Sequence, residues 1–226
     1  MGYRGRMTDE RPGTVVLDVD GTLIDSSYHH ALAWSRALQH SGVTVPVWRI
    51  HRAIGMGGDK LVGAVAGDDV EREHGDEVRD RWEKEYDEII EETRLLPGAK
   101  ELLAALGERG VDVALASSSI PKHARHAFDL LDADDLADTA TTSEDAEESK
   151  PDPELVEEAL SRVDGSPACV VGDSVYDVEA AQLAGLPAYG VLTGGYGRAE
   201  LESAGAAGVY VDLTEMLECL DEWLPS

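Results

Sequence analysis

Short apolar runs alternate along this chain with longer segments in which apolar residues recur at helical spacing. The apolar runs predict buried strands at residues 15–17, 111–116, 168–171 and 188–192, with shorter strands at 139–142 and 208–211. The helical spacing predicts helices at residues 27–40, 99–108, 121–131, 153–163 and 175–184, and a last helix that contains Trp223. Strands that alternate with helices are typical of a doubly wound α/β fold, in which helices cover both faces of a mostly parallel sheet.

One long segment interrupts this alternation. From Ser26 to Leu95 the sequence reads as a helical insertion, and its highly charged part from Gly42 to about Glu92 contains no convincing strand. The run Leu95-Leu96-Pro97-Gly98 then marks a break before the next helix. We therefore expect an α/β core of residues 13–25 and 96–226, a small helical domain of residues 26–95 inserted after the first strand, and a disordered tail of residues 1–12.

The composition is strongly acidic. The 226 residues include 46 acidic and 19 basic side chains, which gives a net charge of −27. A charge of this sign argues against nucleic acid or anionic membranes as partners. Scarce lysine with abundant aspartate and glutamate resembles the surfaces of halophile proteins, and acidic runs such as Asp132 to Asp138 are typical of solvated faces.

The remaining composition favours a cytoplasmic protein. The two cysteines, Cys169 and Cys219, give no disulfide framework, and no apolar run is long enough to span a bilayer. The residues up to Arg11 lack the apolar centre of a signal peptide, and Met7 is an alternative start of translation. We expect a monomer or a homodimer.

Candidate chemistry begins where the first predicted strand ends. Val15-Val16-Leu17 leads directly into Asp18-Val19-Asp20-Gly21-Thr22-Leu23. A carboxylate at the end of a buried strand is poorly solvated, and two together repel each other unless a cation or a hydrogen-bond donor lies between them. A strand followed by an Asx turn would give the same Asp-Gly pair, so the interpretation depends on the segments downstream.

Three later segments place polar residues at strand ends or helix starts. Ser117-Ser118-Ser119 follows a predicted strand, Lys150 precedes a helix, and Asp173 and Asp177 follow another strand. Each has a plainer interpretation: a serine-rich turn, a solvated lysine, and a helix N-cap at Asp173. Because the carboxyl ends of parallel strands meet at one edge of a sheet, we expect Asp18, Ser117 and Asp173 to lie in one site.

These four segments, in this order, resemble the signatures of the haloacid dehalogenase-like (HAD) superfamily. The resemblance is to its branch of phosphoglycolate phosphatases and beta-phosphoglucomutases, which carry a helical cap. Most members of the superfamily are magnesium-dependent phosphatases. The resemblance implies that Asp18 attacks phosphorus and becomes an aspartyl-phosphate, and that Asp20 protonates the leaving oxygen and later activates water. It also implies that Ser117 and Lys150 bind phosphoryl oxygens.

The resemblance implies a Mg²⁺ site as well. Its ligands would be Asp18, the backbone carbonyl of Asp20 and Asp173, and Asp177 would orient their surroundings. Oxygen ligands of this kind are those that magnesium prefers.

The expected substrate is a small phosphorylated metabolite. Its expected contacts beyond the signature residues are Gly21, Ser118, Lys60 and His30. Lys60 lies in the glycine-rich turn Ile54–Leu61 of the inserted domain, which would close over the site as a cap; the turn is equally consistent with a flexible connection. His30 and Trp34 stand where some sugar-phosphate mutases of the family carry the same residue types, although a histidine of the core or surface is the plainer interpretation.

Alternative functions remain open at this stage. A sugar phosphomutase would use the same residues with a different phosphoryl acceptor, but Gly58 stands where such mutases carry a cap arginine. A 2-haloacid dehalogenase of this family lacks the second aspartate, so Asp20 argues against it. A catalytically idle interaction module is disfavoured because every signature residue is present. The glycines of residues 190–197 suggest a dinucleotide loop only superficially, since no helix is expected to begin on them.

Overall fold

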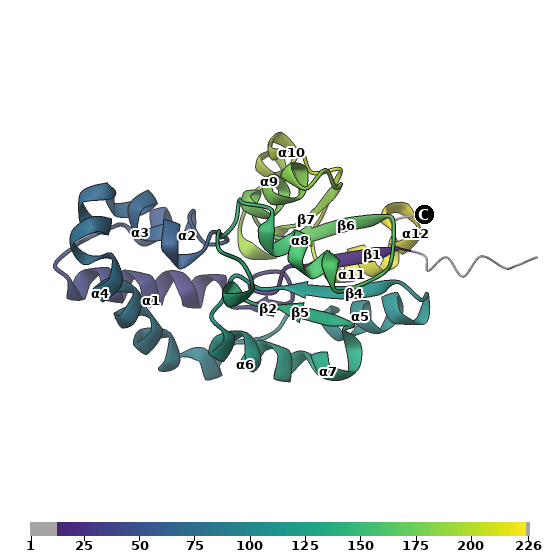
Figure 1. The fold of residues 1–226 in the computed structure, drawn as a ribbon, viewed down its shortest axis with the longest axis horizontal. Coiled ribbons are helices and arrows are strands. Elements are labelled where there is room, and N and C mark those ends of the chain that lie inside the picture. Colours follow the sequence, from purple (N-terminus) through teal and green to yellow (C-terminus); the bar gives the residue numbers. More distant parts are fainter. Residues whose placement is uncertain (1–12, 225–226) are drawn as a thin grey trace, which may run out of the picture.

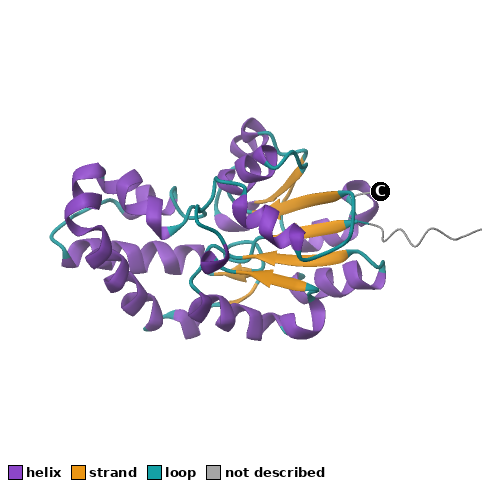
Figure 2. Ribbon diagram, in the orientation of Figure 1, coloured by secondary structure: helices purple, strands orange, loops and turns teal. Residues whose placement is uncertain are grey.

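The computed structural model describes residues 13–224 of the chain. Its centre is a parallel six-stranded sheet in the order β5-β4-β1-β6-β7-β8, with helices on both faces (Figures 1 and 2). The strands are β1 (Thr14–Leu17), β4 (Asp112–Ala116), β5 (Thr139–Thr141), β6 (Ala168–Gly172), β7 (Ala188–Val191) and β8 (Gly208–Tyr210). The predicted doubly wound α/β fold is confirmed, and β1 lies at its centre.

Successive residues of β1 enter two separate apolar cores, one on each face of the sheet. Val15 and Leu17 belong to one core, and Val16 belongs to the other. The first face carries α5 (Ala99–Glu108), α6 (Pro121–Leu131), α7 (Ala133–Leu136), α11 (Leu213–Glu218) and α12 (Leu220–Trp223). The second face carries α8 (Glu154–Ser161), α9 (Val175–Leu183) and α10 (Arg198–Ala204). Burial on both faces is what a central parallel strand requires, and it leaves the strand ends as the place for polar chemistry.

A helical insertion follows β1 and forms an apolar cluster of its own. Its helices are α1 (Ser27–His40), α2 (Val47–His51), α3 (Gly58–Ala66) and α4 (Asp68–Asp87). Trp34 and Leu38 of α1 pack there with Leu61 of α3 and with Val78 and Trp82 of α4. The insertion lies beyond the carboxyl ends of the central strands (Figure 1). We keep the name helical insertion for α1 to α4.

The insertion joins the core through a small two-stranded ribbon. Strand β2 (Ile24–Asp25) pairs antiparallel with β3 (Arg94–Leu95), and a 3₁₀ helix at Ile90–Glu92 precedes β3. Neither strand is predicted from the sequence, and both lie outside the charged stretch up to about Glu92 in which no strand is expected. Two residues are too few to show an alternating pattern, so these strands depend on the pairing of segments distant in sequence.

Two further helices depart from the sequence prediction. Helix α7 lies inside the acidic run from Asp132 to Asp138, where Ala133 packs into the core beside exposed carboxylates. Helix α10 begins after Gly197, whose backbone N–H donates to Glu200 over 2.8 Å. The expectation that no helix starts on these glycines is thus wrong at Gly197, where the side chain of Glu200 caps the first turn of α10.

Short 3₁₀ helices complete the description, at Ser143–Asp145 and Leu192–Gly194. The predicted disordered tail, residues 1–12, lies outside the described residues. Within residues 13–224, no helix combines the length and the apolar character needed to cross a bilayer.

Candidate active site

Asp18 directly follows β1 and is buried at the carboxyl edge of the sheet. Its Oδ1 lies 2.5 Å from Nζ of Lys150, and its Oδ2 accepts a hydrogen bond of 3.0 Å from the hydroxyl of Thr22. Burial raises the pKa of Asp18 to about 7, although the charge of Lys150 opposes the shift. The lysine is therefore the partner that makes an ionised carboxylate tenable at this position.

Lys150 stands between two buried carboxylates. Its Nζ lies 2.7 Å from Oδ1 of Asp177 as well as against Asp18, and it donates over 3.4 Å to the carbonyl of Ala116. Burial alone would lower the pKa of Lys150, but the charges of Asp177 and Asp18 raise it above its usual value. The side chain is therefore a fixed positive charge within reach of Asp18.

Asp20 is held by donors from two segments of the chain. Its Oδ1 accepts from Ser26 at 2.6 Å and lies 3.2 Å from Nε2 of His30, while its Oδ2 accepts from Ser119 at 2.8 Å. Burial would raise the pKa of Asp20, but His30 and these hydroxyl donors hold it well below its usual range. The carboxylate is therefore ionised in this arrangement.

Ser117 and Ser118, which follow β4, differ in their hydrogen bonding. Ser117 is fully buried; its Oγ accepts from the backbone N–H of Ser119 over 3.1 Å and approaches Oδ2 of Asp20 at 3.5 Å. The Oγ of Ser118 is buried and has no hydrogen-bond partner within residues 13–224. An unpaired buried hydroxyl is costly, so Ser118 is the serine with bonding capacity left for a ligand.

Asp173 follows β6, and Ser174, not Asp173, caps the helix after it. The Oγ of Ser174 accepts from the backbone N–H of Asp177, whose Oδ2 accepts from the Ser174 N–H over 3.0 Å. The N-cap interpretation of Asp173 is therefore wrong, and its carboxylate faces the site, where Oδ1 lies 3.2 Å from the Thr22 hydroxyl that also lies against Asp18. Burial and the neighbouring charges of Asp18 and Asp177 raise the pKa of Asp173 well above its ordinary value.

These carboxylates fit a divalent cation. Asp18, Asp173 and Asp177 each offer an oxygen, and the three oxygens lie within 4.8 Å of one another. The ammonium group of Lys150 pairs with two of these three buried carboxylates, Asp18 and Asp177, and Asp173 has no ion pair within residues 13–224. The excess negative charge and the all-oxygen donor set are those of a hard cation such as magnesium. Asp18 and Asp177 share the ammonium group of Lys150, whereas Asp173 does not pair with it, so Asp173 is the carboxylate with the most capacity left for a cation.

Glycines bring the backbone close to Asp173. A Cβ added to Gly21 would lie 2.5 Å from Oδ2 of Asp173, and one added to Gly194 would lie 1.5 Å from the same atom. Gly21 has φ +87°, and both of its backbone polar groups are hydrogen bonded. Its N–H donates to the carbonyl of Ile24 over 2.7 Å, and its carbonyl accepts from the hydroxyl of Thr193 over 2.6 Å. The position requires glycine because an added Cβ would collide with Asp173 and because φ is positive.

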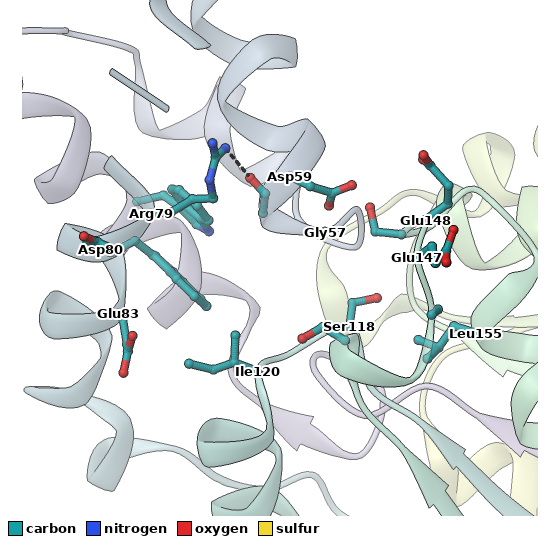
Figure 3. Close-up of a pocket in the computed structure, with 16 residues that line it drawn as sticks. Gly57, Asp59, Arg79, Asp80, Glu83, Ser118, Ile120, Glu147, Glu148 and Leu155 are labelled. Atoms are coloured by element: carbon teal, nitrogen blue, oxygen red, sulfur yellow. Dashed lines mark hydrogen bonds between the residues drawn. The ribbon is translucent and has the colours of Figure 1, made fainter. Parts of the chain in front are cut away.

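Two adjoining cavities lie where the insertion faces the core. The inner cavity, of about 50 Å³, is lined by Asp18, Asp20, His30, Trp34, Ile54, Gly55, Met56, Gly58, Leu61, Trp82, Ser118 and Ser119. The outer cavity, of about 310 Å³, shares Trp34, Gly58, Trp82 and Ser118 with it and opens toward loop residues of the core (Figure 3). His30, stacked on Tyr86 with ring centroids 3.9 Å apart, thus lies beside the candidate phosphoryl site.

Lys60 connects the insertion to the core. Its Nζ donates over 2.6 Å to the carbonyl of Ser149 and lies 3.1 Å from a carboxylate oxygen of Glu148. It lines neither cavity, so its expected contact with a substrate stays a prediction. Its partners adjoin Lys150, which places this connection one residue from the buried ion pair.

A second connection lies at the other side of the insertion, around α2. His51 is hydrogen bonded through Nε2 to the carbonyl of Gly194 over 2.9 Å, and its ring stacks on Tyr28. The carbonyl of Arg52 accepts from the hydroxyls of Tyr176 at 2.9 Å and Tyr196 at 2.7 Å. The sequence assigns no role to these residues: Tyr176 lies between Asp173 and Asp177 in the last signature segment, and the others lie outside the four segments.

Three comparisons with known proteins agree on the family. The model of a family described as haloacid dehalogenase-like hydrolase matches residues 12–185. A relative named phosphoglycolate phosphatase from Rhodobacter capsulatus is 28% identical over 92% of this chain and 97% of its own, and one from Pseudomonas fluorescens strain Pf0-1 is 30% identical over 97% and 84%. The crystal structure of a hydrolase from Pseudomonas syringae matches with a TM-score of 0.87 and 31% identity, over 93% of this chain and 99% of that one.

Proposed function

This chain belongs to the haloacid dehalogenase-like hydrolase family, and we propose that it hydrolyses the phosphomonoester of a small metabolite through an aspartyl-phosphate on Asp18. The observation that carries the proposal is the ion pair of 2.5 Å between Asp18 and Lys150, buried at the carboxyl edge of the sheet. A buried lysine can hold a carboxylate ionised and also neutralise the charge of an incoming phosphoryl group.

In the proposed first half-reaction, Asp18 attacks phosphorus and the P–O bond to the substrate alcohol breaks. The alcohol oxygen takes a proton from Asp20 as it leaves. Lys150 and Ser117 bind non-bridging phosphoryl oxygens and orient phosphorus in line with the attacking carboxylate. Ser118, whose Oγ has no partner within the described residues, is a further donor to the phosphoryl group.

In the second half-reaction, Asp20 takes a proton from water as the water oxygen attacks phosphorus. The P–O bond to Asp18 then breaks, which releases inorganic phosphate and regenerates the Asp18 carboxylate. The contacts of Asp20 with Ser26, His30 and Ser119 favour its ionised form, which suits this base role. For the acid role, Asp20 must gain a proton, and a phosphoryl group that competes for the hydroxyl of Ser119 would weaken the contacts that keep it ionised.

A magnesium ion held by Asp18, Asp173 and the backbone carbonyl of Asp20 would neutralise charge on the phosphoryl oxygens. Asp177 would act through its contacts, since it holds Lys150 and the start of α9 in place.

The test is phosphate release from p-nitrophenyl phosphate in the presence of magnesium. We expect the natural protein to release phosphate and Asp18→Asn to release none, because an amide is not a nucleophile here. Asp25→Asn, an exposed residue of the same segment, is the matched control and should retain the natural rate. Circular dichroism would verify that each variant is folded. Turnover by folded Asp18→Asn would overturn the proposal.

A further inference from the structure

The outer cavity is the place for the alcohol part of a substrate. It shares Trp34, Gly58, Trp82 and Ser118 with the inner cavity, which contains the two candidate catalytic aspartates. A phosphoryl group at Asp18 would therefore point its ester oxygen toward the outer cavity, whose lining then meets the rest of the molecule (Figure 3).

Arg79 is the one cationic side chain among the described residues that line this cavity, and it is already engaged. Its guanidinium binds both carboxylate oxygens of Glu71, at 2.8 and 3.1 Å, and Asp76 at 2.9 Å. It also donates over 3.3 Å to the carbonyl of Gly58. Two carboxylates already surround the single positive charge of Arg79, so its guanidinium can attract a further anion only weakly.

Carboxylates dominate the rest of the charged lining. They come from both sides of the cavity: Asp59, Asp80 and Glu83 from the insertion, and Glu147 and Glu148 from the core. Glu148 is paired with Lys60 at 3.1 Å and Glu83 with Lys122 at 3.3 Å. The structure gives no ion pair to the other three within residues 13–224. An anionic group here meets uncompensated negative charge.

The cavity does carry neutral hydrogen-bonding groups. The Oγ atoms of Ser118 and Ser149 and the indole Nε1 of Trp82 are buried polar atoms of its lining, and none has a partner in the described part of the chain. Trp82 stacks on Trp34 with ring centroids 4.8 Å apart, which gives the cavity an aromatic wall. Hydroxyl or amino groups of a ligand can satisfy such atoms, and an aromatic wall favours neutral or cationic groups over anions.

We propose that the outer cavity selects phosphomonoesters of hydroxylated or amino alcohols and rejects those that carry a second anion. The proposal rests on the proposed function, since it assumes that the phosphoryl group lies at Asp18. The relatives are named after phosphoglycolate, which carries a carboxylate next to its phosphate ester. The proposal therefore predicts that phosphoglycolate is a poor substrate of this chain. It likewise disfavours sugar bisphosphates, which carry a second phosphate.

Three two-carbon esters that differ only in their end group provide the test: 2-phosphoglycolate, 2-hydroxyethyl phosphate and phosphoethanolamine. We expect kcat/KM of the hydroxyl and ammonium esters to exceed that of the carboxylate ester by roughly tenfold, since one repulsive contact costs on the order of 1 kcal/mol. Measurements belong at the lowest salt concentration at which the protein is folded, because salt screens the effect. Hydrolysis of 2-phosphoglycolate as fast as that of 2-hydroxyethyl phosphate would overturn the proposal.

Matched charge reversals test whether this cavity is responsible. Glu147→Lys should raise the ratio of carboxylate-ester to hydroxyl-ester kcat/KM about tenfold by the same arithmetic. Glu144→Lys makes the same change on an exposed residue of the same loop that does not line the cavity, and should leave the ratio as it is. Equal ratios in both variants would contradict the proposal. Hydrolysis of p-nitrophenyl phosphate distinguishes the two failures: if that ester is also inert, the proposed function itself is wrong.

Discussion

His51 of α2 is hydrogen bonded through Nε2 to the backbone carbonyl of Gly194 over 2.9 Å, and the bond is buried. The two residues are 143 positions apart in sequence. Gly194 also packs against Asp173, one of the carboxylates that could hold a metal ion. The insertion and the candidate metal site thus both contact the backbone at Gly194. A substitution there should affect both the packing of α2 and the position of Asp173.

We predict that Gly194→Ala lowers activity by weakening metal binding. The added methyl group would lie 1.5 Å from Oδ2 of Asp173, so the carboxylate or the backbone must move. Displacing the surroundings of a metal ligand costs roughly 10–100-fold in metal affinity or activity. Activity measured against magnesium concentration would show the shift. Gly107→Ala, a helix position with open space around its Cβ, is the control, and an equal effect there would refute the assignment.

A second prediction concerns Lys60. The ammonium group of Lys60 binds Ser149 and Glu148, and the side chain lines neither cavity. Lys60→Ala should therefore lower kcat/KM by similar factors for p-nitrophenyl phosphate and for a larger metabolite. Losing one charge-assisted hydrogen bond corresponds to about 1.5–3 kcal/mol, or roughly 10- to 150-fold. Lys84→Ala, exposed on α4, serves as the control. A loss of kcat/KM confined to the larger substrate would instead indicate that Lys60 contacts that substrate.

A third prediction concerns the stability of the fold in acid. Burial lowers the pKa of His123 below the ordinary histidine value of 6.5, although its contact with Asp87 at 3.0 Å opposes the shift. The unfolded chain binds a proton at this residue near pH 6.5, whereas the folded protein resists protonation until a lower pH. Between those two values the unfolded state holds more protons, so the free energy of unfolding falls as the pH falls.

His123→Gln should therefore lose less stability than the natural protein when the pH is lowered from 7.5 to about 5.5, since it removes a group that titrates in that window. Chemical unfolding curves at both pH values give the comparison. His74→Gln, a less buried residue on α4, should behave like the natural protein. If His123→Gln shows the same pH dependence as the natural protein, the histidine has no part in it.

A fourth prediction concerns salt. The 46 acidic against 19 basic side chains repel one another in the compact state, and salt screens this repulsion over distances that shrink from about 10 Å at 0.1 M to about 3 Å at 1 M. We expect the melting temperature and the activity to rise from dilute to molar potassium chloride at fixed magnesium. A melting temperature that stays flat or falls up to about 2 M would remove the likeness to halophile proteins.

Much of the fold and the inner site was accessible from the sequence because both follow local patterns. Apolar runs located the six strands of the parallel sheet, and the ends of three of them carry Asp18, Ser117 and Asp173. The carboxyl ends of parallel strands necessarily meet at one edge, so short segments far apart in sequence could be assigned to one site.

The remaining features depend on docking between distant segments. Nothing near Ser26 or Ser119 in the sequence shows that both hydroxyls bind the Asp20 carboxylate, since one precedes α1 and the other follows β4. The contact of His51 with Gly194 arises only once the insertion lies against the core. The ribbon of β2 and β3 likewise exists only as a pair, with too few residues for a periodic signal.

The central place of β1 has a consequence for the order in which a nascent chain can acquire structure. β1 leaves the ribosome early, but its neighbours β4 and β6 comprise residues Asp112–Ala116 and Ala168–Gly172. The insertion, by contrast, packs an apolar cluster from residues between Ala31 and Ile89, so it can collapse during synthesis while β1 is still unpaired. Asp18 meets Lys150 only after synthesis has passed residue 150, and we expect a translation product that stops before β6 to have a collapsed insertion beside an incomplete carboxyl edge of the sheet.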